Sequence, residues 1–233
     1  MSAEIKPVGH IFTPFTQKFG IPRQGAGLSI ARGELVFEPE INAEEACAGI
    51  VEFSHLWLIF QFHQHADKPW SNKVRPPRLG GNNKIGVFAS RSSFRPNGLG
   101  MSVVKLIDVG VRSLKVEGVD MISGTPIFDI KPYIAYADAI DNAKSAYAQD
   151  APENTLAVKY TEQARLKLNA LSQKYSDIVA LIDAVVASDP RPAYKQKKAD
   201  EKQYHVRIYD VDVLFTISAT QASINDLIVV KPS

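Results

Sequence analysis

Short apolar runs, separated by glycine, proline, serine and asparagine, occupy most of the first 136 residues of the chain. Apolar runs of this length that end at such breakers are typical of strands. Their succession predicts a mainly antiparallel sheet or barrel. The expected strands are ELVFE (34–38), HLWLIFQF (55–62), KIGVFAS (84–90), MSVVKLIDVG (101–110), SLKVEGVDM (113–121) and TPIFDI (125–130), and Asn42 is expected to cap a short helix between the first two.

The pattern changes near residue 141, where helical spacing replaces the short runs. Ala164, Leu168 and Leu171 lie on one face of an expected helix that Thr161 caps, and a second apolar helix is expected after a Ser176 cap. Both apolar faces predict core packing. This part of the chain therefore contains helices as well as strands.

Beyond the second helix, Pro190 and Pro192 prevent the helix from continuing. Apolar residues then alternate along residues 204–217, and the alternation changes phase at Tyr209 and Asp210. A phase change of this kind predicts a β-bulge in an edge hairpin or small sheet.

The composition, with 45% hydrophobic residues over 233, is sufficient for a full core. The sequence shows no signal-peptide pattern and no apolar run of roughly 18 residues, so we expect a cytoplasmic protein without membrane association. Cys47 is the single cysteine, which excludes an intrachain disulfide framework and a cysteine-rich zinc site. His55, His63 and His65 have no carboxylate array beside them, so we expect no metal site.

Positive charge is concentrated in one stretch. Residues 68–107 contain no Asp or Glu and carry eight Lys or Arg side chains, and since the whole chain has a net charge of +2, the rest carries −6. A basic block in an otherwise acidic chain indicates a surface for a polyanion. The alternative is a solvated surface loop.

Common catalytic signatures are missing from the sequence. It contains no G-x-S-x-G, Walker or H-E-x-x-H motif, and neither GAGLSI (25–30) nor GLGMSV (98–103) completes a dinucleotide fingerprint. A Rossmann nucleotide site is therefore not expected. A small-molecule hydrolase has no nucleophile and base pattern to support it.

The segment GVFASRSSFRPNGLG (86–100) combines two arginines with serines, an asparagine and glycines. Guanidinium groups bind carboxylate or phosphate through two parallel hydrogen bonds, hydroxyls and amides bind ribose, and glycines allow close approach of the backbone. The segment is therefore interpreted as a turn-rich rim of a binding site. For Arg95, Pro96 and Asn97, a turn without ligand contact is the alternative.

Six segments, taken in order, carry a resemblance to a known family. They are PRQ (22–24), SHLWLIFQFHQ (54–64), VRPPRLGGN (74–82), GVFASRSSFRPNGLGMS (86–102), GTPIFDIKPY (124–133) and DPRPAYK (189–195). On these segments the chain resembles the TrmO-type tRNA N6-methyltransferases, also called the YaeB or TsaA-like family, over nearly its whole length. The resemblance implies a mainly β fold, with a single-sheet antiparallel β-barrel domain (1–140) that binds S-adenosylmethionine and a smaller α+β domain (141–233) that assists tRNA binding.

The resemblance also implies an activity and a site. The family transfers a methyl group from S-adenosylmethionine to N6 of threonylcarbamoyladenosine, next to the anticodon of threonine tRNA, and its members are usually homodimers. The implied cofactor-binding residues are Pro22, Arg23, Gln24, His63, Gln64, Arg91, Asp120, Met121, Ile122 and Ser123. At Ser123 many relatives have Asp.

Methyl transfer from a sulfonium requires mainly alignment of the two reactants and removal of the proton from the acceptor nitrogen. Asp120, Asp129 and Tyr194 are candidates for catalytic roles, and for Asp120 a turn cap before Gly124 is the alternative. Tyr194 is also a candidate for stacking on a base. The expected RNA-binding residues are Arg75, Arg78, Arg95, Arg191 and Lys195.

A protein without turnover is the alternative function. A non-catalytic RNA-binding barrel, or a barrel that senses S-adenosylmethionine, would show the same basic block. The two functions differ in whether a complete cofactor pocket faces that block.

Overall fold

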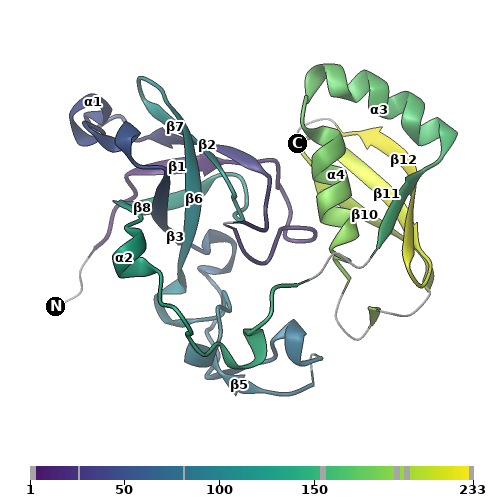
Figure 1. The fold of residues 1–233 in the computed structure, drawn as a ribbon, viewed down its shortest axis with the longest axis horizontal. Coiled ribbons are helices and arrows are strands. Elements are labelled where there is room, and N and C mark those ends of the chain that lie inside the picture. The colour runs from purple at the N-terminus through teal and green to yellow at the C-terminus, as the bar shows by residue number, and fades with distance from the viewer. Residues whose placement is uncertain are drawn as a thin grey trace. The chain divides into compact units, whose positions relative to one another are not determined.

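The computed structural model describes residues 4–25, 27–80, 82–152, 156–191, 195–196 and 200–230. The chain forms two compact units (Figure 1), of which the first comprises Met1–Thr13 and Arg23–Gln149 and the second comprises Pro14–Pro22 and Asp150–Ser233. The sequence placed one boundary after residue 140. In the structure the first unit extends to Gln149, and the segment Pro14–Pro22 belongs to the second unit.

The first unit is built around a closed barrel of six strands, each paired antiparallel with its neighbours. Alternate residues of each strand point inward, and Ile11, Leu56 and Leu114 are fully buried there. The expected antiparallel barrel is confirmed. The strands in barrel order are β1 (Gly9–Phe12), β2 (Arg32–Phe37), β7 (Ser113–Glu117), β6 (Leu99–Val109), β3 (His55–Gln61) and β8 (Thr125–Pro132).

A long loop joins β3 to β6 and contains only short elements. The expected strand over residues 84–90 is wrong, because only β5 (Ile85–Gly86) pairs, with β4 (Lys73–Val74), before the chain turns at Val87–Ala89. The Ser90 hydroxyl donates to the Val87 carbonyl and closes this turn. The other short elements of the first unit are α1 (Ala43–Ala46), η1 (Ile50–Glu52), η2 (His63–His65), η3 (Pro77–Leu79), η5 (Pro96–Gly98), α2 (Ala135–Asp138) and η6 (Ala146–Ala148). Asn42 caps α1, as expected.

In the second unit, the helices α3 (Glu162–Lys174) and α4 (Ile178–Ala187) pack with a four-stranded sheet (Figure 1). The sheet order is β10 (Asp200–Ile208), β11 (Val211–Ile217), β12 (Gln221–Val229) and β9 (Ala157–Tyr160). The apolar helix faces and the inward residues of the strands, such as Val213 and Phe215, form its core. The expected α+β character of this part is confirmed.

Two local predictions in the second unit need correction. Thr161 caps α3, as expected, but α4 begins after Asp177 rather than Ser176, because the N–H of Ile178 bonds the Tyr175 carbonyl in a tight turn. The expected β-bulge at Tyr209 and Asp210 is a two-residue hairpin turn between β10 and β11, in which Tyr209 has φ of +55°. Such a turn also reverses the phase of alternation, since the paired residues on either side of it share one face.

No helix in the described ranges is both long enough and apolar enough to cross a membrane. Within the same ranges, no three His, Cys, Asp or Glu side chains gather into a metal-binding group.

Candidate active site

The centre of the candidate site is the carboxyl group of Asp120, in the loop between β7 and β8. The Ser102 hydroxyl on β6 donates a hydrogen bond of 2.7 Å to Asp120 Oδ1. Burial raises the pKa of Asp120 above its ordinary value, although the bond from Ser102, the charge of Arg91 and the N–H of Gly25 each lower it. A carboxyl group with a raised pKa is better matched to proton transfer near neutral pH.

Gly25 follows the PRQ segment and brings its backbone against the barrel. A Cβ at this position would stand 2.4 Å from the Gly118 carbonyl oxygen and 3.5 Å from Asp120 Cγ, so no other residue fits without a backbone shift. The Gly25 carbonyl accepts hydrogen bonds of 3.0 Å from the N–H groups of Leu28 and Ser29, which fix the turn. Glycine is therefore required by close approach at this point.

Arg91 connects the PRQ segment to the rim segment 86–100. Its Nη1 donates to Gln24 Oε1 at 2.6 Å, and its charge acts on Asp120. Arg91 is exposed, and a guanidinium carries five N–H donors, so Arg91 can also bind a ligand from solvent. Three segments that are distant in the sequence thus meet at Gln24, Arg91 and Asp120.

The loop after Asp120 is held by hydroxyl groups. Thr13 Oγ1 donates to the Met121 carbonyl at 2.8 Å, and the Thr13 N–H donates to Ser123 Oγ at 3.2 Å. Thr125 Oγ1 donates to the Ile122 carbonyl and lies 3.4 Å from His63 Nδ1. This loop therefore brings His63 to the segment that contains Asp120.

The remaining expected cofactor residues differ in exposure. Met121 is 2% exposed, so its side chain belongs to the core. Its backbone carbonyl accepts the bond from Thr13. Arg23 and Gln64 are exposed, and Pro22 is half-buried in the segment that belongs to the second unit. Ile122 is half-buried.

The other two catalytic candidates do not join Asp120 in the described contacts. Asp129 on β8 accepts the N–H of Ile130 at 2.9 Å and pairs with Lys131 at 3.3 Å, along its own strand. Tyr194 lies outside the described residues.

The expected RNA-binding residues occupy different settings. Arg75 and Arg78 are exposed in the long loop, and Arg95 is half-buried with its Nη1 donating to the Ser90 carbonyl at 3.2 Å. Lys195 Nζ lies 3.3 Å from the Tyr204 hydroxyl.

Arg191 was expected on the RNA surface, but the structure places it inside the second unit. Its side chain is fully buried, and it donates from Nε and Nη2 to the two carboxylate oxygens of Asp189 at 2.8 and 2.7 Å. A buried guanidinium in such a pair is not presented to phosphate in this conformation. We therefore leave Arg191 out of the RNA-binding set.

Ser102, Thr13 and Gly25 belong to the site but were not singled out in the sequence. Ser102 and Gly25 do lie inside or next to the segments that carry the family resemblance. Serine, threonine and glycine occur throughout the sequence, so residue type alone does not mark these positions. Their role follows from contacts with residues 18 or more positions away, such as that of Ser102 with Asp120.

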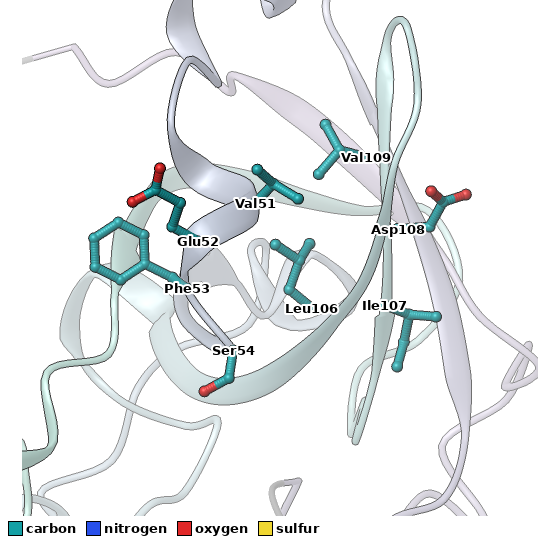
Figure 2. Close-up of a pocket in the computed structure, with 8 residues that line it drawn as sticks. All are labelled: Val51, Glu52, Phe53, Ser54, Leu106, Ile107, Asp108 and Val109. Atoms are coloured by element: carbon teal, nitrogen blue, oxygen red, sulfur yellow. The ribbon is translucent and has the colours of Figure 1, made fainter.

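Figure 2 shows a pocket elsewhere on the first unit, between η1 and the bulged part of β6. Its lining consists of Val51, Glu52, Phe53, Ser54, Leu106, Ile107, Asp108 and Val109. These residues are all different from the expected site residues. Its lining includes no Lys or Arg, in contrast to the basic block, and of its two acidic residues Asp108 pairs with Lys115 at 3.1 Å.

Comparison with known proteins finds similar proteins over both parts of the chain. The model of the tRNA-methyltransferase O N-terminal domain matches residues 10–139, and that of the TrmO C-terminal domain matches residues 153–229. A tRNA (adenine(37)-N6)-methyltransferase of Escherichia coli is 40% identical over 93% of this chain and 94% of its own. A Pseudomonas aeruginosa protein named "Putative S-adenosylmethionine-dependent methyltransferase RcsF" is 45% identical over 91% of this chain and 92% of its own.

A solved structure, the crystal structure of TrmO from Pseudomonas aeruginosa, superposes with a TM-score of 0.83 at 35% identity and covers 98% of both chains. The barrel, the two family models and the named relatives therefore define a methyltransferase that uses S-adenosylmethionine on a β-barrel. Both family models and the full-length relatives show that the chain belongs to the TrmO family.

Proposed function

We propose that this chain transfers a methyl group from S-adenosylmethionine to N6 of threonylcarbamoyladenosine at position 37 of threonine tRNA, as a cytoplasmic homodimer. The observation that carries the proposal is the meeting of Gln24, Arg91 and Asp120, which joins three of the family's cofactor segments in one place. The relatives named for methylation of adenine 37 support the reaction and its position. The threonylcarbamoyl group, the threonine tRNA, the dimer and the compartment are the finer parts of the proposal.

The residues of this site fit the cofactor. The exposed guanidinium of Arg91 offers a fork for a carboxylate, and the loop 120–125 offers backbone and hydroxyl groups for ribose and adenine. When bound, S-adenosylmethionine supplies an activated methyl group. Gln24 holds Arg91 in place through its 2.6 Å bond, so the fork is ordered before the ligand arrives.

Asp120 is assigned the proton from the acceptor nitrogen. N6 loses its proton when its bond to the methyl carbon forms, and a carboxylate within reach can accept that proton. Asp120 is preferred to Asp129 because burial raises its pKa and because it lies in the group with Arg91. Asp129 and Tyr194 keep auxiliary roles in the proposal.

Arg75, Arg78 and Arg95 in the long loop, together with Lys195, are assigned to tRNA phosphates. Each phosphate contact releases condensed counterions, so losing one reduces the slope of log affinity against log salt by roughly 0.7 to 0.9. Arg75→Ala and Arg78→Ala should each show this reduction and leave S-adenosylmethionine binding unchanged. Arg32→Ala, an exposed arginine paired with Glu117 outside the loop, is the control and should keep the wild-type slope. A wild-type slope in both loop variants would remove the loop from the RNA surface.

The proposed function is tested by comparing methyl transfer to threonine tRNA with and without the threonylcarbamoyl group. A site that hydrogen-bonds this group leaves buried polar partners unpaired when the group is missing, and such sites reject the truncated substrate by about 10⁴-fold or more. Equal rates of methyl transfer to both tRNAs would refute the proposal that threonylcarbamoyladenosine is the substrate. Binding of both ligands without any transfer would instead favour the non-catalytic barrel.

A further inference from the structure

We propose that Trp70, Phe88 and Phe94 form a stacking surface on which unpaired bases of the tRNA anticodon loop lie. The proposal rests on the proposed function, since it takes tRNA as the ligand, and it adds the part of the RNA that is recognised and the contact that recognises it. The three residues belong to the long loop between β3 and β6.

All three aromatic side chains are open to solvent. Trp70 is 50% exposed, Phe88 is 78% exposed and Phe94 is 40% exposed. Aromatic side chains stabilise a protein mainly when they are buried. Three exposed ones in one loop therefore indicate a surface that a partner covers.

Hydrogen bonds bring the three aromatic residues into one substructure. The N–H of Ser71, next to Trp70, donates to the Phe94 carbonyl at 3.4 Å. The N–H of Val87, next to Phe88, donates to the Asn72 carbonyl at 3.0 Å. The pairing of β4 with β5 lies beside these bonds, in the lower part of the first unit in Figure 1.

Phe94 also has a fixed orientation. Its ring lies against the ring of His65, with centroids 4.4 Å apart and an interplanar angle of 37°. Because one face of the Phe94 ring is covered in this way, the exposed part is held in place. A held ring loses little conformational entropy when a base stacks on it.

The charge around these rings selects the partner. Between residues 68 and 107 the sequence has no Asp or Glu, and Lys68, Lys73, Arg75, Arg78, Lys84 and Arg91 are all exposed there. Aromatic rings interleaved with positive charges are the arrangement by which proteins bind single-stranded nucleic acid, with bases on the rings and phosphates on the cations. An anticodon loop, whose bases are unpaired, fits this arrangement better than a duplex stem does.

The pocket in Figure 2 provides an internal contrast. Val51 and Phe53 are also exposed there, at 73% and 39%, but the lining includes the carboxylate of Glu52 and no Lys or Arg. Carboxylates repel phosphate, so exposed apolar area alone does not identify an RNA surface. The basic block is what distinguishes the loop.

The test measures binding of the anticodon stem-loop of threonine tRNA over a series of salt concentrations. Trp70→Ala, Phe88→Ala and Phe94→Ala should each weaken binding by about 5- to 150-fold, the range for one stacked base. Because stacking releases no counterions, the salt slope should stay that of the wild type, in contrast to Arg75→Ala. Tyr136→Ala is the matched control, since Tyr136 is 91% exposed on α2, outside the loop, and it should bind as the wild type does.

A second readout uses the fluorescence of Trp70. Binding of the stem-loop should quench it, and a fully paired duplex of the same stem should not. Trp57 is the other tryptophan, so the signal is taken as the difference between the wild type and Trp70→Phe.

Unchanged affinity in all three folded variants would overturn the proposal. The proposal would also be overturned if the wild type sediments as a dimer and the three variants sediment as monomers at the same concentrations. That result would mean that the rings face a second copy of the chain. Failure of the proposed function is separate from both outcomes, since it is measured on the wild type with modified and unmodified tRNA.

Discussion

Each unit of the molecule contains an aspartate that is shielded from solvent, Asp120 in the first and Asp189 in the second, and the two have different partners. In the first unit, Asp120 is held by a hydroxyl and a backbone N–H, and Arg91 acts on it as a charge while donating to Gln24. In the second unit, Asp189 is 2% exposed and forms a two-bond ion pair with Arg191.

The difference separates a carboxyl group without a paired cation from one that is held in an ion pair. A carboxylate that accepts two hydrogen bonds from a guanidinium has a full charge partner. Removing either member of such a buried pair destabilises the protein, because the other charge is left buried alone. Where burial raises the pKa of a carboxyl group and no guanidinium is bonded to it, the group can gain and lose a proton at a pH closer to neutral. The same side chain thus forms a buried ion pair in one unit and, in our proposal, accepts a proton in the other.

The largest effect is expected from breaking the buried pair. Arg191→Met should lower the free energy of unfolding by about 3–5 kcal/mol, because it leaves the Asp189 carboxylate buried without its cation. Urea unfolding measures the change. Arg207→Met is the control: Arg207 makes the same two-bond contact with Asp212, at 2.7 Å each, but both side chains are a fifth to a quarter exposed, so the loss should stay within about 1 kcal/mol. Equal losses in the two variants would contradict the structural role of the buried pair.

The next effect concerns the cofactor in the first unit. Arg91→Ala should weaken binding of S-adenosylmethionine by about 1.5–3 kcal/mol, the range for a hydrogen bond to a charged group. Calorimetric titration measures it, with Arg32→Ala as the arginine control outside the site. Wild-type affinity in a folded Arg91→Ala protein would show that the fork does not hold the cofactor.

The smallest effect is a pH-dependent change of stability at Asp120. A carboxyl group whose pKa is raised by folding favours the folded state at low pH, and this contribution is lost as the pH rises through the folded-state pKa. Asp120→Asn removes the charge, so it should be more stable than the wild type at pH 8 by roughly 0.5–2 kcal/mol and similar to it at pH 4. Thermal unfolding at both values measures the difference, and methyl transfer should fall. A gain of the same size at pH 4 and pH 8 would mean that desolvation of the carboxylate is not the cause.

The barrel could be predicted from sequence because its strands are long enough to show where apolar runs start and stop. Five of the six barrel strands overlap the expected segments, while β1, which has only four residues, was not recognised. The segment 84–90 is apolar enough for a strand but lies in a loop without a neighbouring strand beyond Lys73–Val74, so tertiary context decided its conformation.

The candidate site was predictable only in part. The resemblance supplied Gln24, Arg91 and Asp120, and the structure brings them together. The burial of Arg191 was not predictable, because its pairing with Asp189 two residues earlier depends on a turn in which Asp189 has φ of +48°. A sequence containing Asp, Pro and Arg in succession shows the charges but not the turn.

The closed barrel has a further consequence for how the chain behaves when it is concentrated or partly unfolded. Strands joined in a circle leave no backbone edge on which another chain could add a strand. The described sheet of the second unit is open, with β10 and β9 at its edges. Lys202 and His205 are exposed along β10, and β9 has only four residues, including the exposed Lys159. Charge and shortness at these edges discourage self-association into fibres, so the open sheet achieves by its side chains the protection that the barrel has by closure.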